Sequence, residues 1–193
     1  MKVLLVHAHP LKDSYASALR REALRALRQT KHDVVELDLY RERFQPCLTA
    51  RERKSYYEPP ANQASVGRYV AQLRAARAVV FVFPAWWYGP PAILKGYLDR
   101  VWVPGVAFTL DGDDVKPALN NLRSLAIVTS FAATMKEVRA IGDPLRKTFA
   151  AGLRTMCCPK AHLKWMALYE SESTSDARRR RFLRSVGRAM KTL

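Results

Sequence analysis

An aromatic loop offers the most distinctive side chains in this sequence. It reads Pro84-Ala-Trp-Trp-Tyr-Gly-Pro-Pro91 and follows an unbroken apolar run. Indole and phenol rings present large flat faces, so neighbouring rings can form the wall of a pocket for a flat aromatic ligand. The loop therefore predicts that the rings of Trp86, Trp87 and Tyr88 lie beside such a ligand.

A second polar turn, His7-Ala-His-Pro-Leu-Lys-Asp-Ser14, follows the first apolar run of the chain. The turn ends in two good N-cap residues, Asp13 and Ser14, and a long helix pattern follows. Free N–H groups and the helix dipole make such a turn a site for an anion such as phosphate. His9, Lys12 and the Ser14 hydroxyl could add donors. The turn lacks the G-x-G-x-x-G and P-loop patterns, which argues against a Rossmann dinucleotide site and a Walker NTPase.

The elements around the aromatic loop are a buried strand and an amphipathic helix. Ala78–Phe83 is rich in β-branched and aromatic residues, as expected for a strand covered on both faces. Pro84 cannot donate to a central ladder and so ends the strand. Pro90 and Pro91 suit the first turn of a helix, and Ala92–Val101 has helical apolar spacing. The loop therefore lies at a strand's carboxyl end.

The rest of the chain alternates between strand and helix patterns. Further strands are expected at residues 2–7, 33–39, 122–129 and 160–169, and further helices at residues 14–28, 49–55, 62–77, 142–156 and 176–190. Alternation predicts an α/β fold with a parallel sheet and helices on both faces. We expect one flavodoxin-like domain over residues 1–193, with five parallel strands in the order 2-1-3-4-5. Ligands of that topology bind between strands one and three, which the two loops follow.

Composition narrows the function classes. The 33 Lys and Arg against 17 Asp and Glu give a formal net charge of +16, which attracts polyanions or phosphorylated ligands. The positive charge is spread over several segments, and no nucleic-acid-binding module is recognisable, so we read it as solvated surface. No apolar run is long enough for a membrane span. The cysteines, Cys47, Cys157 and Cys158, form no disulfide or metal-binding pattern, which favours a reducing cytoplasm.

The segment Phe83-Pro-Ala-Trp-Trp-Tyr-Gly-Pro-Pro-Ala-Ile-Leu-Lys-Gly-Tyr-Leu-Asp-Arg-Val101 resembles the hallmark of flavodoxin-like NAD(P)H:quinone oxidoreductases of the DT-diaphorase type. The turn containing His9 and Ser14 is similar to the phosphate loop of that family. The segments Asp38–Tyr40 and Phe44–Thr49 also resemble it. The resemblance covers nearly the whole chain and includes bacterial relatives, among them ancillary proteins of potassium efflux systems.

This resemblance implies FAD or FMN held at the interface of a homodimer, with NAD(P)H and a planar acceptor taking turns at one flavin face. His9, Ser14 and Tyr15 would lie by the flavin phosphate. The residues along the isoalloxazine edge would be Pro84, Ala85, Trp86, Trp87 and Tyr88. Thr129, Ser130, Phe131 and Ala132 stand where the family has a Thr- and Gly-rich loop, whose backbone N–H groups would meet the flavin's pyrimidine side.

The sequence also departs from the family pattern. The Thr129–Ala132 loop lacks glycine and so has less backbone freedom. The tyrosine and histidine of the mammalian-type loop are absent here. Two tyrosines that reach over the partner's flavin in that type match Phe108 and Leu110, which predicts a more apolar substrate pocket.

The resemblance points to two-electron reduction of quinones or similar planar acceptors, by hydride transfer from NAD(P)H through the flavin. The flavin supplies the chemistry, so we assign no catalytic side chain and no metal site. Two other classes stay open at this stage. One is an ancillary subunit that docks on a membrane transporter, and the other, less favoured, is a nucleic-acid-binding protein.

Overall fold

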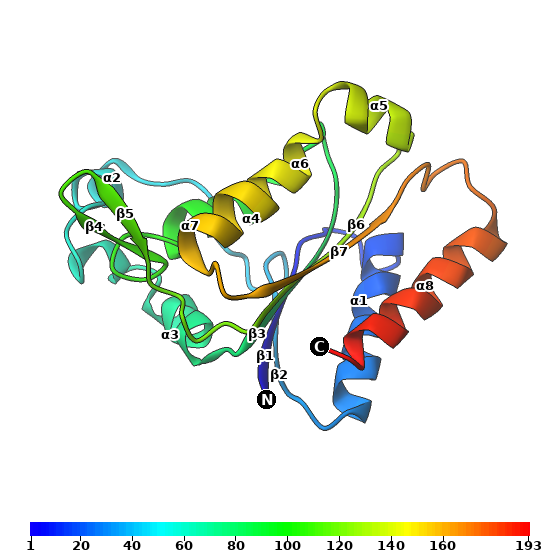
Figure 1. The fold of residues 1–193 in the computed structure, drawn as a ribbon, viewed down its shortest axis with the longest axis horizontal. Coiled ribbons are helices and arrows are strands. Elements are labelled where there is room, and N and C mark those ends of the chain that lie inside the picture. The colour runs from blue at the N-terminus through cyan, green and yellow to red at the C-terminus, as the bar shows by residue number, and fades with distance from the viewer.

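The computed structural model describes all residues, 1–193, and is built on a five-stranded parallel sheet (Figure 1). The strands are β1 Lys2–His7, β2 Asp33–Asp38, β3 Ala78–Pro84, β6 Ser124–Ser130 and β7 His162–Leu168. They lie in the order β2-β1-β3-β6-β7, and each neighbouring pair is parallel. The predicted α/β class and five parallel strands are confirmed.

The strand order along the whole chain is 2-1-3-6-7 and not the predicted 2-1-3-4-5. The difference arises because β4 Phe108–Asp111 and β5 Asp114–Pro117 pair with each other as an antiparallel hairpin outside the sheet. Residues 106–116 carry a turn signal at Asp111-Gly-Asp, where the hairpin turns.

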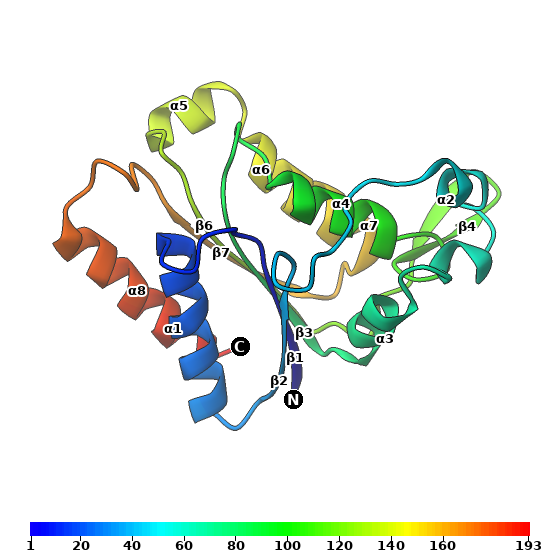
Figure 2. The same cartoon turned by 180° about the vertical axis from the view of Figure 1, so that it is seen from behind.

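Helices cover both faces of the sheet. α1 Tyr15–Gln29 and α8 Asp176–Met190 lie side by side on one face (Figures 1 and 2). The other face carries α3, α4 and the helical segment before β7, and α5 lies beyond the carboxyl ends of the strands. Their bounds are α3 Gly67–Ala75, α4 Ala92–Val101, α5 Met135–Ala140, α6 Pro144–Arg146, the π-helix η2 Lys147–Arg154 and α7 Thr155–Cys157.

Burial follows strand position in the sheet. The central strands β3 and β6 are almost completely buried, as their continuous apolar runs predict. The edge strands β2 and β7 keep partly exposed positions. Two apolar clusters result, one beneath α1 and α8 and a larger one beneath the opposite helices, so the sheet is a rigid platform for the loops at its ends.

The segment between β2 and α3 forms a small excursion. Thr49 caps α2 Ala50–Lys54 in a capping box with Glu52, as the Thr-x-x-Glu spacing predicts. Arg100 of α4 holds the excursion to the sheet layer, with Nε donating to Glu52 at 3.0 Å. Although burial raises the pKa of Glu52, hydrogen bonds from Arg100, Ser65 and Thr49 lower it to about 2.

The predicted helix over residues 62–77 is shorter than expected. A 3₁₀ turn, η1 Ala61–Gln63, comes first, and α3 begins only at Gly67. The buried Asn62 amide donates to the carbonyls of Tyr56 and Pro104 instead of capping a helix. Tertiary bonds therefore override the local helical pattern.

Candidate functional site

The loops after β1, β3 and β6 converge at the carboxyl end of the sheet. They enclose a cavity of about 660 Å³, which we call the central cavity. It is lined by His9, Ser14, Tyr15, Ala16, Pro84, Ala85, Trp86, Trp87, Ser130, Ala132, Ser171, Glu172 and Arg179. Three stretches far apart in the sequence thus meet where doubly wound sheets bind ligands.

The loop after β1 presents backbone donors to the central cavity. Ser14 caps α1, and its Oγ accepts the Ser17 N–H at 3.1 Å. The N–H groups of Tyr15 and Ala16 at the start of α1 have no acceptor in the protein. The site therefore combines free amides with the positive end of a fifteen-residue helix, a combination that favours a bound anion.

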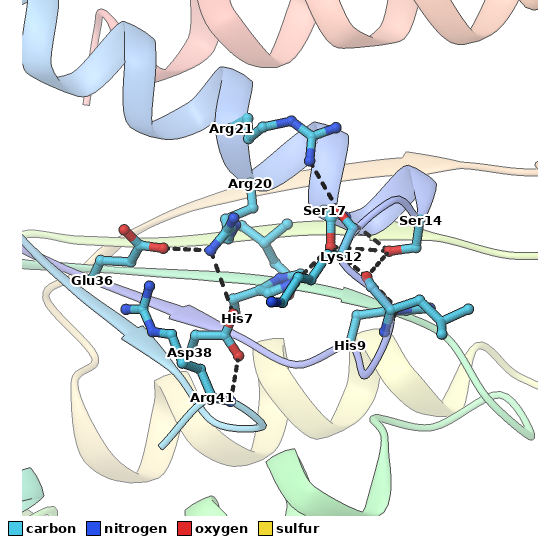
Figure 3. A network of polar contacts seen from close by, with 12 residues as sticks. His7, His9, Lys12, Ser14, Ser17, Arg20, Arg21, Glu36, Asp38 and Arg41 are labelled. Carbon is cyan, nitrogen blue, oxygen red and sulfur yellow. Dashed lines mark hydrogen bonds and ion pairs between the residues drawn. The ribbon is translucent and has the colours of Figure 1, made fainter. Parts of the chain in front are cut away.

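A buried network beneath this loop fixes its shape (Figure 3). Nδ1 of His7 lies 3.0 Å from the Val82 carbonyl, so Nδ1 carries the proton, and Nε2 lies 3.3 Å from Oγ of Ser17, whose hydroxyl donates to the Leu11 carbonyl at 2.8 Å. Ser14 in turn donates to the Leu11 carbonyl at 3.0 Å. Burial lowers the pKa of His7 to about 4, even though nearby Asp38 opposes that shift. His7 is thus a neutral structural support, as its place in the strand predicts.

The aromatic loop after β3 is a tight turn. Trp86 and Gly89 exchange backbone hydrogen bonds of 3.0 Å, and the residues between them, Trp87 and Tyr88, have φ of 49° and 56°. Positive φ at two successive residues is the pattern of a type I′ turn, which normally takes Asn and Gly. Non-glycine residues are strained in that conformation, and such strain often occurs at functional sites.

The two tryptophans differ in exposure. Trp86 is 41% exposed and packs edge-on against the His9 ring, with the ring centroids 5.8 Å apart, whereas Trp87 is 98% exposed. Tyr88 is half-buried, packs against the main core and is not among the residues that line the cavity. The loop therefore offers two indoles to a ligand and uses its tyrosine for anchoring.

The loop after β6 divides its residues between cavity and core. Ser130 and Ala132 line the central cavity. Thr129 is fully buried, and Phe131 stacks on Tyr169 with ring centroids 5.1 Å apart. The side chains of Thr129 and Phe131 therefore lie in the core. The N–H groups of Ala132 and the following Ala133 have no acceptor in the protein, so the loop keeps two free backbone donors.

Phe108 and Leu110, the predicted substrate-pocket residues, are not brought to the central cavity. Both belong to β4 of the hairpin. Phe108 lines a separate apolar groove of about 400 Å³ that includes Leu98, Trp102 and Met156, and Leu110 is exposed. In the single chain these two residues thus form part of a different surface.

Three polar residues of the central cavity were not predicted, namely Ser171, Glu172 and Arg179. The Arg179 guanidinium donates to the Ser171 carbonyl at 2.9 and 2.8 Å and to the Glu172 carbonyl at 2.8 Å. It thereby fastens the loop after β7 against α8. Ser171 and Glu172 follow the fifth strand, and that position at the sheet's carboxyl end is a signal that could have identified them.

Tyr15 joins α1 to α8 at the cavity wall. Its hydroxyl donates to the Arg179 carbonyl at 2.9 Å. Burial raises the pKa of Tyr15 to about 12, against the opposing effect of the Arg179 charge. Tyr15 therefore stays protonated at neutral pH and serves as a hydrogen-bond donor and apolar wall. No group of three or more His, Cys, Asp or Glu side chains is arranged to hold a metal ion.

Comparison with known proteins decides the family. The sequence pattern of the flavodoxin-like fold family matches residues 1–157. An Escherichia coli protein named as the uncharacterized NAD(P)H oxidoreductase YcaK is 36% identical over 133 residues, which are 66% of this chain and 64% of that protein. Rat NAD(P)H dehydrogenase (quinone) 1 is 32% identical over 160 residues, 74% of this chain and 58% of the rat enzyme. The chain belongs to the flavodoxin-like NAD(P)H:quinone oxidoreductase family.

The family resemblance read from the aromatic motif is thus confirmed. Solved structures agree with the flavodoxin-like fold of this chain. Smu.1420 from Streptococcus mutans is 28% identical, with a TM-score of 0.88 and complete coverage of both chains. An FMN-dependent NADH-azoreductase from Bacillus anthracis, solved with FMN, is 13% identical with a TM-score of 0.79, over 99% of this chain and 98% of the azoreductase. That second likeness concerns the fold alone. The chain spans less than two thirds of the length of the two curated relatives above.

Proposed function

We propose that this protein is a flavin-dependent NAD(P)H oxidoreductase that reduces quinones or similar planar acceptors by two electrons. The observation that carries the proposal is the central cavity, where three loops bring unpaired backbone N–H groups and two indoles together. The relatives named NAD(P)H oxidoreductase and NAD(P)H dehydrogenase (quinone) support this function over a transporter-docking subunit or a nucleic-acid binder.

The donors of the cavity fit the charge distribution of a flavin nucleotide. The free amides at the start of α1, with His9 and Ser14 beside them, suit the flavin phosphate. Trp86 and Trp87 suit the edge of a tricyclic ring. The free N–H groups of Ala132 and Ala133 suit the carbonyl and nitrogen acceptors of its pyrimidine side.

A flavin held here by the free amides and the two indoles would supply two-electron hydride chemistry between NAD(P)H and the acceptor. The chain's own residues bind and orient. Donors at Ala132 and Ala133 would stabilise negative charge close to them, because preorganised amides pay no reorganisation cost when charge develops. No side chain need act as acid or base, so none is assigned as catalytic.

Cofactor identity is proposed as FAD or FMN. The central cavity extends from the Ala132 loop past the start of α1 to Arg179, Ser171 and Glu172. Its far end could hold the second nucleotide half of FAD or remain open above FMN. The relative solved with FMN makes FMN the first cofactor to test.

We further propose a homodimer with the flavin site at its interface, and one flavodoxin-like domain over residues 1–193. Trp87 is almost fully exposed on a rigid turn beside the cavity, and exposed aromatic side chains are typical of surfaces that become covered. β7 and α8 follow the matched residues 1–157, yet complete the sheet and cover one of its faces. The exposed indole supports the dimer, and the place of β7 and α8 in the sheet and its cover supports a single domain over the whole chain.

None of the helices combines the length and hydrophobicity that crossing a bilayer requires. All three cysteines are free thiols, and burial raises the pKa of Cys157 to about 12 and that of Cys158 to about 11, so both stay protonated. Unpaired cysteines support the proposal of a reducing compartment, the cytoplasm.

A spectroscopic experiment tests the proposed function. The purified protein, reconstituted with FMN or FAD, should be yellow, should bleach when NADH or NADPH is added without oxygen, and should recover its colour with a quinone. Retention of neither flavin, or a flavin that neither donor bleaches, would contradict the proposal. Steeply salt-dependent retention of DNA without flavin binding would favour the nucleic-acid reading.

A further inference from the structure

A second cavity lies on the other side of the loop that follows β1. This edge cavity has a volume of about 670 Å³ and is bounded by that loop, the first turns of α1 and the turn after β2. It shares only His9 with the central cavity. Its volume is in the range of pockets that bind small molecules.

The wall of the edge cavity is strongly basic. Five of its residues are cations and one is an acid, Asp38. The cations are Lys12, Arg20, Arg21, Arg41 and Arg43. The segments that supply them are separate in sequence, so the fold gathers positive charge from three elements at one concave place. Such concave gathering focuses the electrostatic field on an anion.

The acid in this wall is already paired within the protein. Arg20 Nη1 lies 2.6 Å from Glu36 and 3.4 Å from Asp38, and all three side chains are mostly buried (Figure 3). The second oxygen of Asp38 accepts the Arg41 N–H at 3.1 Å. This buried triad therefore forms a polar floor, and Asp38 has both oxygens occupied by the protein.

The rim cations, by contrast, have no carboxylate partners. Lys12, Arg41 and Arg43 make no side-chain hydrogen bond or ion pair, and Arg21 donates only to the Lys12 carbonyl at 3.0 Å. Elsewhere in the chain several arginines are paired, as Arg25 is with Glu22 and Arg100 with Glu52. Four unpaired cations around one cavity leave their donors for a ligand.

The turn that carries two of these arginines is firmly held. Glu42 N–H donates to the Asp38 carbonyl at 2.9 Å, and Phe44 N–H donates to the Leu39 carbonyl at 2.9 Å. Arg43 has φ of 50°, a left-handed conformation that costs a non-glycine residue energy. The fold thus holds Arg43 in a strained position at the cavity rim.

We propose that the edge cavity binds the phosphate groups of a nucleotide, at a site separate from the central cavity. Guanidinium groups match phosphate oxygens through paired N–H···O bonds, and an ammonium adds a point charge. The half-buried ring of Tyr40 in the wall offers an apolar surface for the base or sugar. The source of the phosphate is either the 2′-phosphate of NADPH or a free diphosphate. Nucleotide binding at this site does not require the oxidoreductase function proposed above or a flavin in the central cavity.

Calorimetric titration of the purified full-length chain tests this site, with and without saturating FMN. The ligands are 2′,5′-ADP, 5′-ADP, inorganic pyrophosphate and adenosine. We expect one phosphorylated nucleotide bound per chain, no binding of adenosine, and no effect of FMN. The double variant Arg41→Gln/Arg43→Gln should weaken nucleotide binding by at least about tenfold, since two phosphate donors are lost. Both positions are exposed, so the variant should fold normally.

A matched control removes the same charge elsewhere. Arg184 and Arg188 are exposed, unpaired and outside the edge cavity, so Arg184→Gln/Arg188→Gln should bind nucleotide as the parent does. Tighter binding of 2′,5′-ADP than of 5′-ADP identifies NADPH as the source of the phosphate. Equal affinity for 2′,5′-ADP and 5′-ADP, together with competition by pyrophosphate, identifies a diphosphate.

Several results would overturn the proposal. These are equal binding of adenosine, displacement of nucleotide by FMN, unchanged affinity in Arg41→Gln/Arg43→Gln, or equal losses in the two double variants. Equal losses accompanied by binding of long oligonucleotides would show a general basic surface instead of a nucleotide site.

Discussion

The central and edge cavities are nearly equal in volume, about 660 and 670 Å³, and meet at His9, yet their walls are chemically opposite. The central cavity is lined by aromatic, hydroxyl and small residues, with one arginine and one glutamate. The edge cavity carries five cations and one acid. The volume of a cavity therefore does not indicate its ligand here. The two cavities differ in which hydrogen-bond donors remain unpaired.

The donors of the central cavity are mostly backbone N–H groups, whereas those of the edge cavity are side chains. Backbone donors are fixed by the fold and suit a group that must be held in one orientation. Long cationic side chains reach and adapt, and suit the capture of a charged group. One loop, residues 8–14, separates the two: the free amides of Tyr15 and Ala16 that follow it serve the central cavity, and the side chain of its Lys12 serves the edge cavity.

The sharpest way to separate the cavities is to fill one of them. Ala132 is exposed and lines only the central cavity, so Ala132→Trp places an indole there without disturbing the core. Flavin affinity should fall by at least about a thousandfold, measured by absorbance titration with FMN and FAD. Binding of 2′,5′-ADP should be unchanged. Retained flavin, or parallel loss of both ligands, would contradict the separation.

Much of this arrangement follows from sequence, and its limits are instructive. Buried apolar runs identified the strands, and Ser14 and the aromatic loop were placed because the loops after strands one and three must meet. Arg179 was missed because, within the run Arg178–Arg181, every arginine has the same local pattern. Only the packing angle of α8 decides which one turns toward the loop after β7.

Other residues depended on details that no pattern reveals. Phe131 directly follows β6, but it turns into the core against Tyr169 while its neighbour Ala132 faces the cavity. The edge cavity was overlooked for a related reason, because Arg20, Arg21 and Arg41 look like solvated residues when taken one at a time. Their common position appears only once β2 and α1 are packed together.

Acidification should affect the support that both cavities share. Burial lowers the pKa of His7 from its ordinary value of 6.5 to about 4. The unfolded chain therefore binds a proton between these values that the folded chain does not, and stability falls as pH drops from about 6.5 to 4. The loss is on the order of 3 kcal/mol. Urea unfolding at several pH values measures it.

Two variants isolate the contribution of His7. His7→Asn should remove most of the pH dependence above pH 4.5, although its stability at pH 7 will be lower. His32, whose pKa is also lowered, is only partly buried, so His32→Gln should keep most of the dependence. If the free energy of unfolding had the same pH dependence in His7→Asn as in the parent, His7 would not be the group responsible for it.

Removing the clamp on the loop after β7 should act on the central cavity alone. Arg179→Ala loses three hydrogen bonds to the Ser171 and Glu172 carbonyls. Flavin affinity should weaken by about tenfold, while the edge cavity keeps its ligand. Arg179→Lys should restore little, because one ammonium cannot reproduce the planar fork. Arg180→Ala is the matched control, since this exposed neighbour makes no such bonds, and it should bind flavin normally.

The smallest effect concerns the strained turn, where stability and binding should move in opposite directions. Trp87 has a positive φ and almost no contacts, so Trp87→Asn should raise the free energy of unfolding by about 0.5 to 1 kcal/mol, because asparagine tolerates this conformation. Flavin affinity should fall several-fold as the indole is lost. Chemical unfolding and flavin titration on the same preparation measure both. Unchanged flavin affinity in Trp87→Asn would mean that the indole serves an interface instead. Trp87→Tyr keeps a flat ring, and in that case it should change neither the free energy of unfolding nor the flavin affinity.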